Sequence, residues 1–175
     1  MTIFIALARA VNVGGTGKLA MRDLKVICEQ AGCRQVQTYI ASGNVVFSSG
    51  QTEARVQVAL ETGLAAHAGK QVGVLVRTAV EMQSVLAQNP FPDAPPNKTV
   101  AIFLNAPPPA DAASSAVGQQ TEVIALGQRE LYVFYGEGIA SSKLKIPAAK
   151  GGTARNMNTV AKLVDIAMGV SEYPD

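Results

Sequence analysis

The chain has 175 residues, of which 48% are hydrophobic and 16% charged, a composition typical of a folded globular protein and unlike that of a disordered one. Its formal net charge of +2 is too small to indicate nucleic-acid or membrane binding by itself. The two cysteines make no disulfide framework and are expected to be free thiols, and the apolar N-terminal run is too short to span a bilayer, so the sequence predicts a cytoplasmic protein with no membrane association.

The first part of the chain predicts strand, helix, strand, strand, helix and strand. These segments are, in order, 3–10, 21–31, 36–40, 44–48, 51–68 and 72–76. Gly32 follows the first helix, where a helix stop is expected. The second and third strands are separated by a tight turn and can therefore pair only in the antiparallel sense. This order is the split βαβ, ferredoxin-like pattern.

The rest of the chain predicts a similar order after a connection. The expected elements are a helix over 78–88, a strand over 99–105, a proline-led helix over 107–117, strands over 122–126 and 130–135 and a final helix over 157–168. Thr78 and Glu81 form a capping box, and Asn156 can cap the final helix. The proline-rich stretch 89–98 cannot form regular structure.

We therefore expect an α+β fold of two ferredoxin-like (split βαβ, α/β plait) halves with largely antiparallel sheets. The first half spans residues 1–77 and the second 99–175, joined by the helix and proline-rich connection of 78–98 into one compact unit. No sequence repeat relates the halves, so a duplication is an expectation about structure alone.

A glycine-rich segment, VNVGGTGKLA (11–20), lies between the first strand and the first helix. A phosphate-binding Walker loop needs glycine where Asn12 stands and a hydroxyl where Leu19 stands. Gly15, Gly17 and Ala20 match a dinucleotide fingerprint in spacing, but the acidic residue that would bind ribose is missing. Two interpretations stay open: a tight strand-to-helix turn, and a modest anion site made by helix-start amides and Lys18.

Other kinds of site find little support. His67 is the single histidine and has no neighbouring nucleophile in the sequence, so a surface position is expected. One histidine and two cysteines five residues apart do not make a metal-binding pattern. We expect no metal and no cofactor.

Charge is unevenly distributed along the chain. No acidic residue occurs between Gly138 and Leu163, a stretch that carries five basic residues, and none occurs between Met1 and Arg22. The basic residues of the later stretch are Lys143, Lys145, Lys150, Arg155 and Lys162. Backbone amides, hydroxyls and cationic side chains concentrated in this way suit an anionic ligand, and a solvated basic surface is the alternative.

Several strings together resemble the bacterial "domain of unknown function 1697" family over essentially the whole chain. The strings are IALARAVNVGGTGKLAMRDLKVICEQAG, VQTYIASGNVVFSS, NPFP, ELYVFYGEGIASSKL and TARNMNTVAKLVDIA. The family typically has glycine where this chain has Ala10 and often has tryptophan where it has Met157. The resemblance implies a compact α+β protein of ferredoxin-like halves, and it implies no reaction.

The strings that carry the resemblance most strongly are polar loops, which are better functional candidates than core residues. We expect a shallow anion-binding cleft where these loops approach one another. Its predicted residues are Asn12, Gly14, Gly15, Lys18, Ser42, Asn44, Lys143, Lys145, Arg155 and Asn156.

The favoured hypothesis is a binding module for a phosphorylated or nucleotide-like ligand or RNA. An enzyme of unknown class is an alternative, although the polar loops contain no paired carboxylate or nucleophile–base pair. A protein-interaction or self-associating domain that uses sheet edges is the other alternative.

Overall fold

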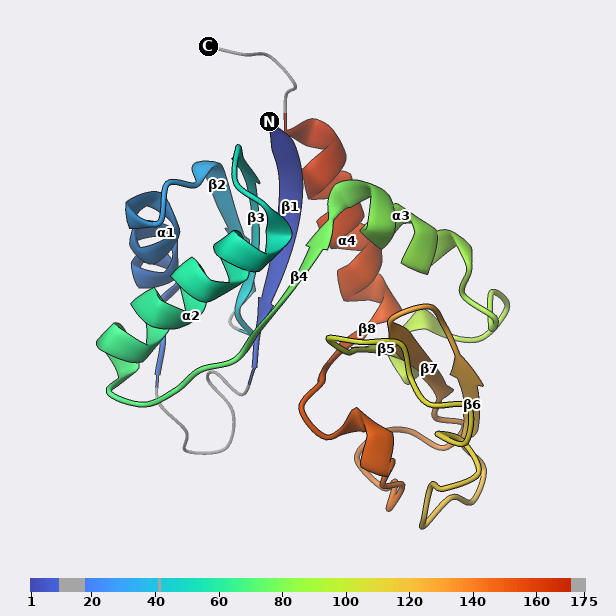
Figure 1. The fold of residues 1–175 in the computed structure, drawn as a ribbon. Helices are drawn as coiled ribbons and strands as arrows, with labels where there is room; N and C mark the ends of the chain where they lie inside the picture. Colours follow the sequence, from blue (N-terminus) through green and yellow to red (C-terminus); the bar gives the residue numbers. More distant parts are fainter. Residues whose placement is uncertain (10–17, 41, 171–175) are drawn as a thin grey trace. The chain divides into compact units, whose positions relative to one another are not determined.

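The computed structural model describes residues 1–9, 18–40 and 42–170, and it shows the expected α+β fold (Figure 1). The chain divides into two compact units, Met1–Gln83 with Lys162–Asp175, and Ser84–Ala161. Each unit contains one four-stranded sheet in which every neighbouring pair of strands is antiparallel.

The first unit has the predicted split βαβ order. Its elements are β1 (Thr2–Ala8), α1 (Met21–Gln30), β2 (Arg34–Tyr39), β3 (Asn44–Ser49), α2 (Glu53–Ala68) and β4 (Val74–Thr78). The strands lie in the order β2-β3-β1-β4, so each helix connects two parallel strands that have one antiparallel strand between them. The predicted segments match these elements to within about two residues at most ends, which is the usual scatter of element boundaries.

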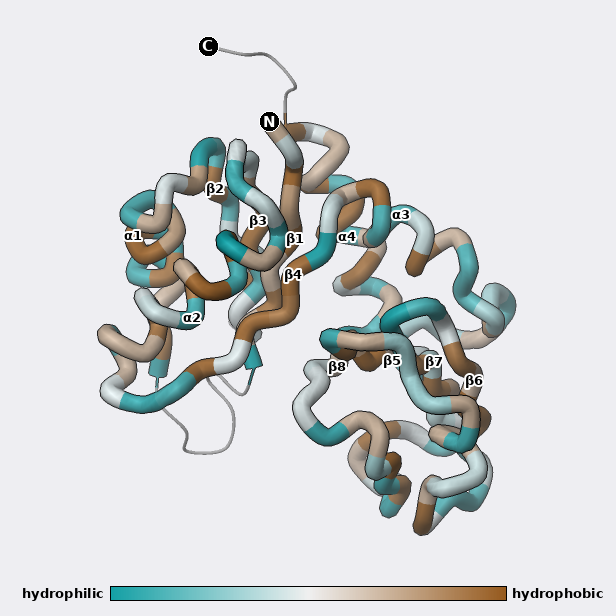
Figure 2. The backbone as a smooth tube through the Cα atoms, viewed as in Figure 1, coloured by the Kyte–Doolittle hydropathy of each residue, from teal (hydrophilic) through white to brown (hydrophobic). Residues whose placement is uncertain are grey.

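Every second side chain of a strand points to the same face of the sheet, and the side chains on one face form the core of the first unit. Phe4, Ala6 and Ala8 on β1 belong to one cluster of buried side chains with α1 and α2. The helix residues of this cluster are Leu24, Ile27, Cys28, Val56, Leu60 and Leu64. Figure 2 shows the hydrophobic character of β1 and β4.

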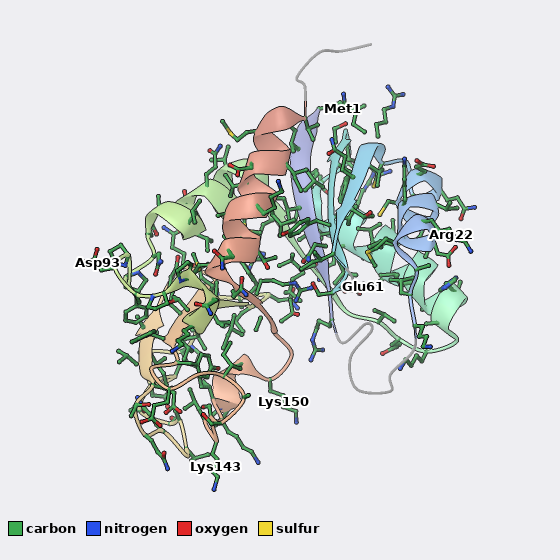
Figure 3. The ribbon with its side chains drawn as sticks, turned by 180° about the vertical axis from the view of Figure 1, so that it is seen from behind. Met1, Arg22, Glu61, Asp93, Lys143 and Lys150 are labelled. Carbon is green, nitrogen blue, oxygen red and sulfur yellow. The ribbon has the colours of Figure 1, made fainter. Side chains whose placement is uncertain are left out.

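The opposite face of this sheet is buried as well. Ile5 and Leu7 on β1 alternate with the cluster residues and are fully buried. The part of α4 (Met157–Gly169) that begins at Lys162 belongs to the same unit and lies beside β1 in Figures 1 and 3. The first sheet is therefore covered on both faces.

The second unit repeats the strand order of the first. Its strands are β5 (Thr99–Phe103), β6 (Val123–Leu126), β7 (Glu130–Phe134) and β8 (Thr153–Asn156), in the order β6-β7-β5-β8. When the strands of each unit are numbered along the chain, both sheets have the order second, third, first, fourth. The hairpin between β6 and β7 turns at 127–129, as predicted.

The predicted helix over 107–117 is wrong, because this segment forms turns. Three consecutive prolines occupy its start, and its alanines and serines offer little apolar surface to bury. The Asp111 carboxylate accepts a hydrogen bond from Ser115 Oγ, and the Asp111 carbonyl accepts one from Ser114 Oγ. Such local side-chain bonds compete with a regular helix.

Irregular segments cover the second sheet in place of the missing helix. Val100, Ile102, Leu131 and Val133 form a core cluster. From the two connections that cross the sheet, Ala112 belongs to the same cluster, and the side chains of Leu144, Ile146, Ala148 and Ala149 pack onto it. The short helix η2 (Pro147–Ala149) lies near the end of the second connection, and the short helix η1 (Pro96–Lys98) directly precedes β5.

Strand β8 was not expected, because its sequence TARN carries no apolar alternation. It pairs with β5 at the edge of the sheet, where four residues suffice. The chain then enters α4 directly.

The last strand of each sheet carries a buried arginine at an equivalent position. Arg77 on β4 lies opposite Ile5 of the central strand β1, and Arg155 on β8 lies opposite Ala101 of the central strand β5. Each arginine is buried and is followed by a residue that caps a helix, Thr78 for α3 (Ala79–Ala87) and Asn156 for α4. The second half therefore echoes the first in structure.

Candidate anion-binding site

The glycine loop contributes one described residue to the predicted site. Asn12, Gly14 and Gly15 lie outside the described residues. Lys18 is exposed and stands just before α1, whose cap residue Ala20 makes no side-chain capping bond. Among the residues predicted for the helix-start site, the structure therefore describes one, the solvent-exposed Lys18.

Ser42 and Asn44 shape a hairpin. Asn44 is 0% exposed, and its Nδ2 donates hydrogen bonds to the Tyr39 carbonyl at 3.0 Å and to Ser42 Oγ at 2.8 Å. Between them Gly43 has a φ of 86°, and its carbonyl accepts a bond from the amide of Ala8. The Asn44 amide is therefore engaged in holding the turn between β2 and β3.

Arg155 lies inside the second unit. Its side chain is 8% exposed, and Nη1 donates to Thr153 Oγ1 at 2.8 Å and to the Ala154 carbonyl at 2.9 Å. Burial lowers the pKa of the guanidinium to about 10, because the charged form is poorly solvated there. It still carries its charge at neutral pH.

Asn156 performs the capping role that the sequence suggested. Its Oδ1 accepts a hydrogen bond from the amide of Thr159 at 2.9 Å, which satisfies an amide in the first turn of α4. This acceptor is therefore engaged in the capping bond.

Lys143 and Lys145 are presented together. In the connection from β7 to β8 they are exposed, while Ser142, Leu144 and Ile146 between and beside them are partly buried. Leu144 and Ile146 pack on the core of the second unit. This alternation places both lysines on the outer side of an extended segment. Figure 3 shows Lys143 and also Lys150 extending away from the ribbon.

The backbone of this segment is anchored. The amide and carbonyl of Lys145 bond the carbonyl and amide of Val117, both at 2.9 Å. Gly118, with a φ of 72°, approaches the backbone carbonyl of Lys143 so closely that a Cβ at this position would overlap it. We call residues 142–146 the lysine segment.

A buried carboxylate adds a second anchor. Glu122 Oε1 accepts a hydrogen bond from Ser142 Oγ at 2.7 Å, and Oε2 accepts one from the Gln120 amide at 2.6 Å. The Gln120 amide, and after it the Ser142 hydroxyl, hold the pKa of Glu122 below its usual value. Burial, and secondarily the charge of Glu122, raises the pKa of Tyr135. Glu122 is thus ionised and bonded to the start of the lysine segment.

The structure brings the predicted residues together in three groups. Ser42 lies with Asn44, Lys143 with Lys145, and Asn156 directly follows Arg155. Lys18 belongs to the first unit and Arg155 to the second, and their sharing one pocket stays a prediction.

Sequence reasoning missed Glu122 and Ser142. Twenty positions separate them, and no spacing rule links a carboxylate before one strand with a serine after the next. Within residues 1–9, 18–40 and 42–170, no group of three histidine, cysteine, aspartate or glutamate side chains could hold a metal ion.

Comparison with known proteins settles the family. Residues 1–132 match the family described as "Protein of unknown function (DUF1697)". The chain belongs to this family. The family resemblance noted from the sequence is thereby confirmed over residues 1–132.

A solved structure shares the fold. It is described as that of the conserved bacterial protein SP0830 from Streptococcus pneumoniae, with a TM-score of 0.78 and 24% sequence identity. The similarity covers 95% of this chain and 98% of that chain. A search of the curated proteins found no match. None of the helices in the described part of the chain is long and apolar enough to cross a membrane.

Proposed function

We propose that this protein binds a phosphate-bearing ligand, nucleotide-like or RNA, through the lysine segment. The observation that carries the proposal is the presentation of Lys143 and Lys145 on one side of an anchored, extended backbone. The anchored backbone keeps the two lysines on one surface, so the positions of their side-chain stems do not have to be assembled when the ligand arrives, while the exposed ammonium groups remain mobile.

The spacing of the two lysines suits more than one phosphate group. Residues two apart in an extended segment have Cα atoms about 7 Å apart, and their side chains lie on the same side. Two flexible ammonium groups at this separation can contact neighbouring phosphates of one ligand. Each lysine attracts a phosphate group as a point charge, without a fixed hydrogen-bond geometry. The site should therefore accept ligands of different shapes rather than select one strictly.

The surrounding sequence supports a cationic surface. No acidic residue occurs from Gly138 to Leu163, and Lys150 lies exposed further along the same connection. Glu122 is the carboxylate bonded to this segment, and both its oxygens accept hydrogen bonds from the protein. These hydrogen bonds leave the negative charge of Glu122 in place, so the attraction depends on the exposed lysines outweighing it.

A titration with three probes tests the proposal. Inorganic pyrophosphate, ATP and a short single-stranded RNA are titrated into the protein at 50 and 200 mM salt. We expect binding at the lower salt that strengthens with the number of phosphates. For RNA contacted by two lysines, affinity should fall about sevenfold between the two salt concentrations.

Two double variants test which lysines supply the positive charge that binds the ligand. The double variant Lys143→Gln/Lys145→Gln should lose most of the binding and most of its salt dependence. Lys25→Gln/Lys70→Gln removes two exposed lysines from the first unit and is the matched control, expected to bind as the unchanged protein does. Equal binding by both double variants, or no binding of any probe at 50 mM salt, would contradict the proposal.

A further inference from the structure

We propose that Cys28 and Cys33 are a redox-active dithiol that closes reversibly to a disulfide by exchange with a small-molecule disulfide. Nothing in the proposed function depends on this pair, which lies at the end of α1 in the first unit.

The backbone at the end of α1 brings these two residues together. The amide of Cys33 bonds the carbonyl of Cys28 at 3.0 Å, and the amide of Gly32 bonds the carbonyl of Glu29 at 3.0 Å. With Gly32 at a φ of 86°, these two bonds make a Schellman motif. In this motif the side chains on either side of the glycine turn commonly contact each other, and here both are cysteines.

The two thiols share one buried environment. Cys28 is 0% exposed and Cys33 is 6% exposed, and both belong to the core cluster of the first unit. Both are free thiols, as predicted. Their side chains are hydrogen-bonded to each other, which raises the pKa of Cys28 and lowers that of Cys33. Cys33 is the less deeply buried of the two thiols, and with its pKa lowered it is the one that more readily forms the attacking thiolate.

The exchange proceeds in two balanced steps. The Cys33 thiolate attacks one sulfur of the small disulfide, forms a mixed disulfide and releases one small thiolate, which takes up a proton. Cys28 then loses its proton and attacks the Cys33 sulfur, which forms the protein disulfide and releases the second small thiol. The two cysteines are oxidised by two electrons, and the small disulfide is reduced to two thiols.

The alternative is that the two thiols are simply the apolar contact of the helix end, where a cysteine behaves as a small hydrophobic residue. The two possibilities differ in one measurable property. A prepositioned dithiol forms its disulfide more favourably in the folded chain than in the unfolded one, whereas a merely apolar contact does not.

The experiment equilibrates the full-length protein with glutathione buffers of graded redox ratio, both folded and in urea, and then blocks remaining thiols with an alkylating agent. Trypsin cuts after Lys25 and Arg34, so one peptide, 26–34, carries both cysteines and reports their state by mass. We expect an internal disulfide with two-electron dependence. Its equilibrium constant in the folded chain should exceed that in urea by at least roughly tenfold, equivalent to about 30 mV.

The variant Cys28→Ser tests the order of attack. It should accumulate the mixed disulfide between Cys33 and glutathione, because the resolving thiol is gone. The proposal is overturned if the unchanged folded protein yields only mixed disulfides, or if folded and unfolded chains give the same equilibrium constant. Absence of a glutathione adduct in Cys28→Ser would overturn the assignment of Cys33 as the attacking thiol.

Discussion

Gly118 lies where the chain after Val117 passes closest to the backbone of Lys143. Its φ of 72° is strained for any residue with a side chain, and a Cβ would overlap the Lys143 carbonyl. The anchoring of the lysine segment therefore depends on a residue that has neither charge nor side chain.

Replacing Gly118 by alanine should lower the free energy of unfolding by more than about 2 kcal/mol, because backbone strain and overlap add. Urea denaturation measures this change. Gly69→Ala is the control, since Gly69 has a φ of 71° and open space around it, and only the strain of about 1 kcal/mol applies there. Equal losses in the two variants would contradict the close packing of Gly118.

Glu122 links the stability of the second unit to pH. Its pKa in the folded chain is lowered by the Gln120 amide and the Ser142 hydroxyl, so between the folded and unfolded values the unfolded chain binds more protons. Its contribution to stability is therefore present above the unfolded pKa of about 4.3 and is lost as the pH falls through the lower folded value.

The variant Glu122→Gln should accordingly be less stable than the unchanged protein at pH 7, and the difference should shrink below about pH 4. Urea denaturation at a series of pH values measures the difference directly, and other carboxylates cancel in the comparison. A difference that stays constant with pH would show that the ionised form of Glu122 is not the one that the folded chain prefers.

At the scale of elements, helix ends were the most predictable features. Thr78 and Glu81 form the expected capping box, with Thr78 Oγ1 accepting from the Glu81 amide at 3.1 Å and Glu81 Oε1 accepting from the Thr78 amide at 3.2 Å. Asn156 caps α4 as its position suggested. Such caps depend on residues three positions apart, so local sequence suffices to identify them.

Asn156 also stood among the predicted ligand-binding residues, and a cap variant separates the two roles. Asn156→Ala should cost about 1 kcal/mol of stability, because an amide of the first turn loses its acceptor, whereas Asn156→Asp should keep the cap. Thermal or urea denaturation gives the stability. We expect pyrophosphate binding to be unchanged in the alanine variant, and a loss of binding there would return Asn156 to the site.

Elements without a local signal were mispredicted. The segment 107–117 has helix-forming alanines, yet it forms turns because nothing in it offers an apolar stripe to the sheet. Strand β8 forms because it pairs with the edge of β5. This pairing depends on the rest of the second sheet, so the four residues of β8 cannot predict it. The same holds for the bond between Glu122 and Ser142.

At the scale of the whole molecule, two sheets share one strand order. Helices fill both connections between the parallel strands of the first unit, whereas the described chain of the second unit crosses with turns and the short helix η2. The equivalent positions of Arg77 and Arg155 reinforce the correspondence, although their sequences share little beyond the arginine. Strand patterning therefore predicted the architecture, while the irregular crossovers that carry the lysine segment became visible only in the structure.

The most direct test of the anion-binding account is to map the ligand on the folded protein by amide chemical-shift changes during a titration with pyrophosphate. The account predicts that the largest changes fall on residues 142–146 and on the facing residues 117–120. Additional changes at Lys18 and Arg155 would extend the site to the wider cleft that the sequence suggested. Changes confined to residues outside the lysine segment, or spread evenly over the chain, would contradict it.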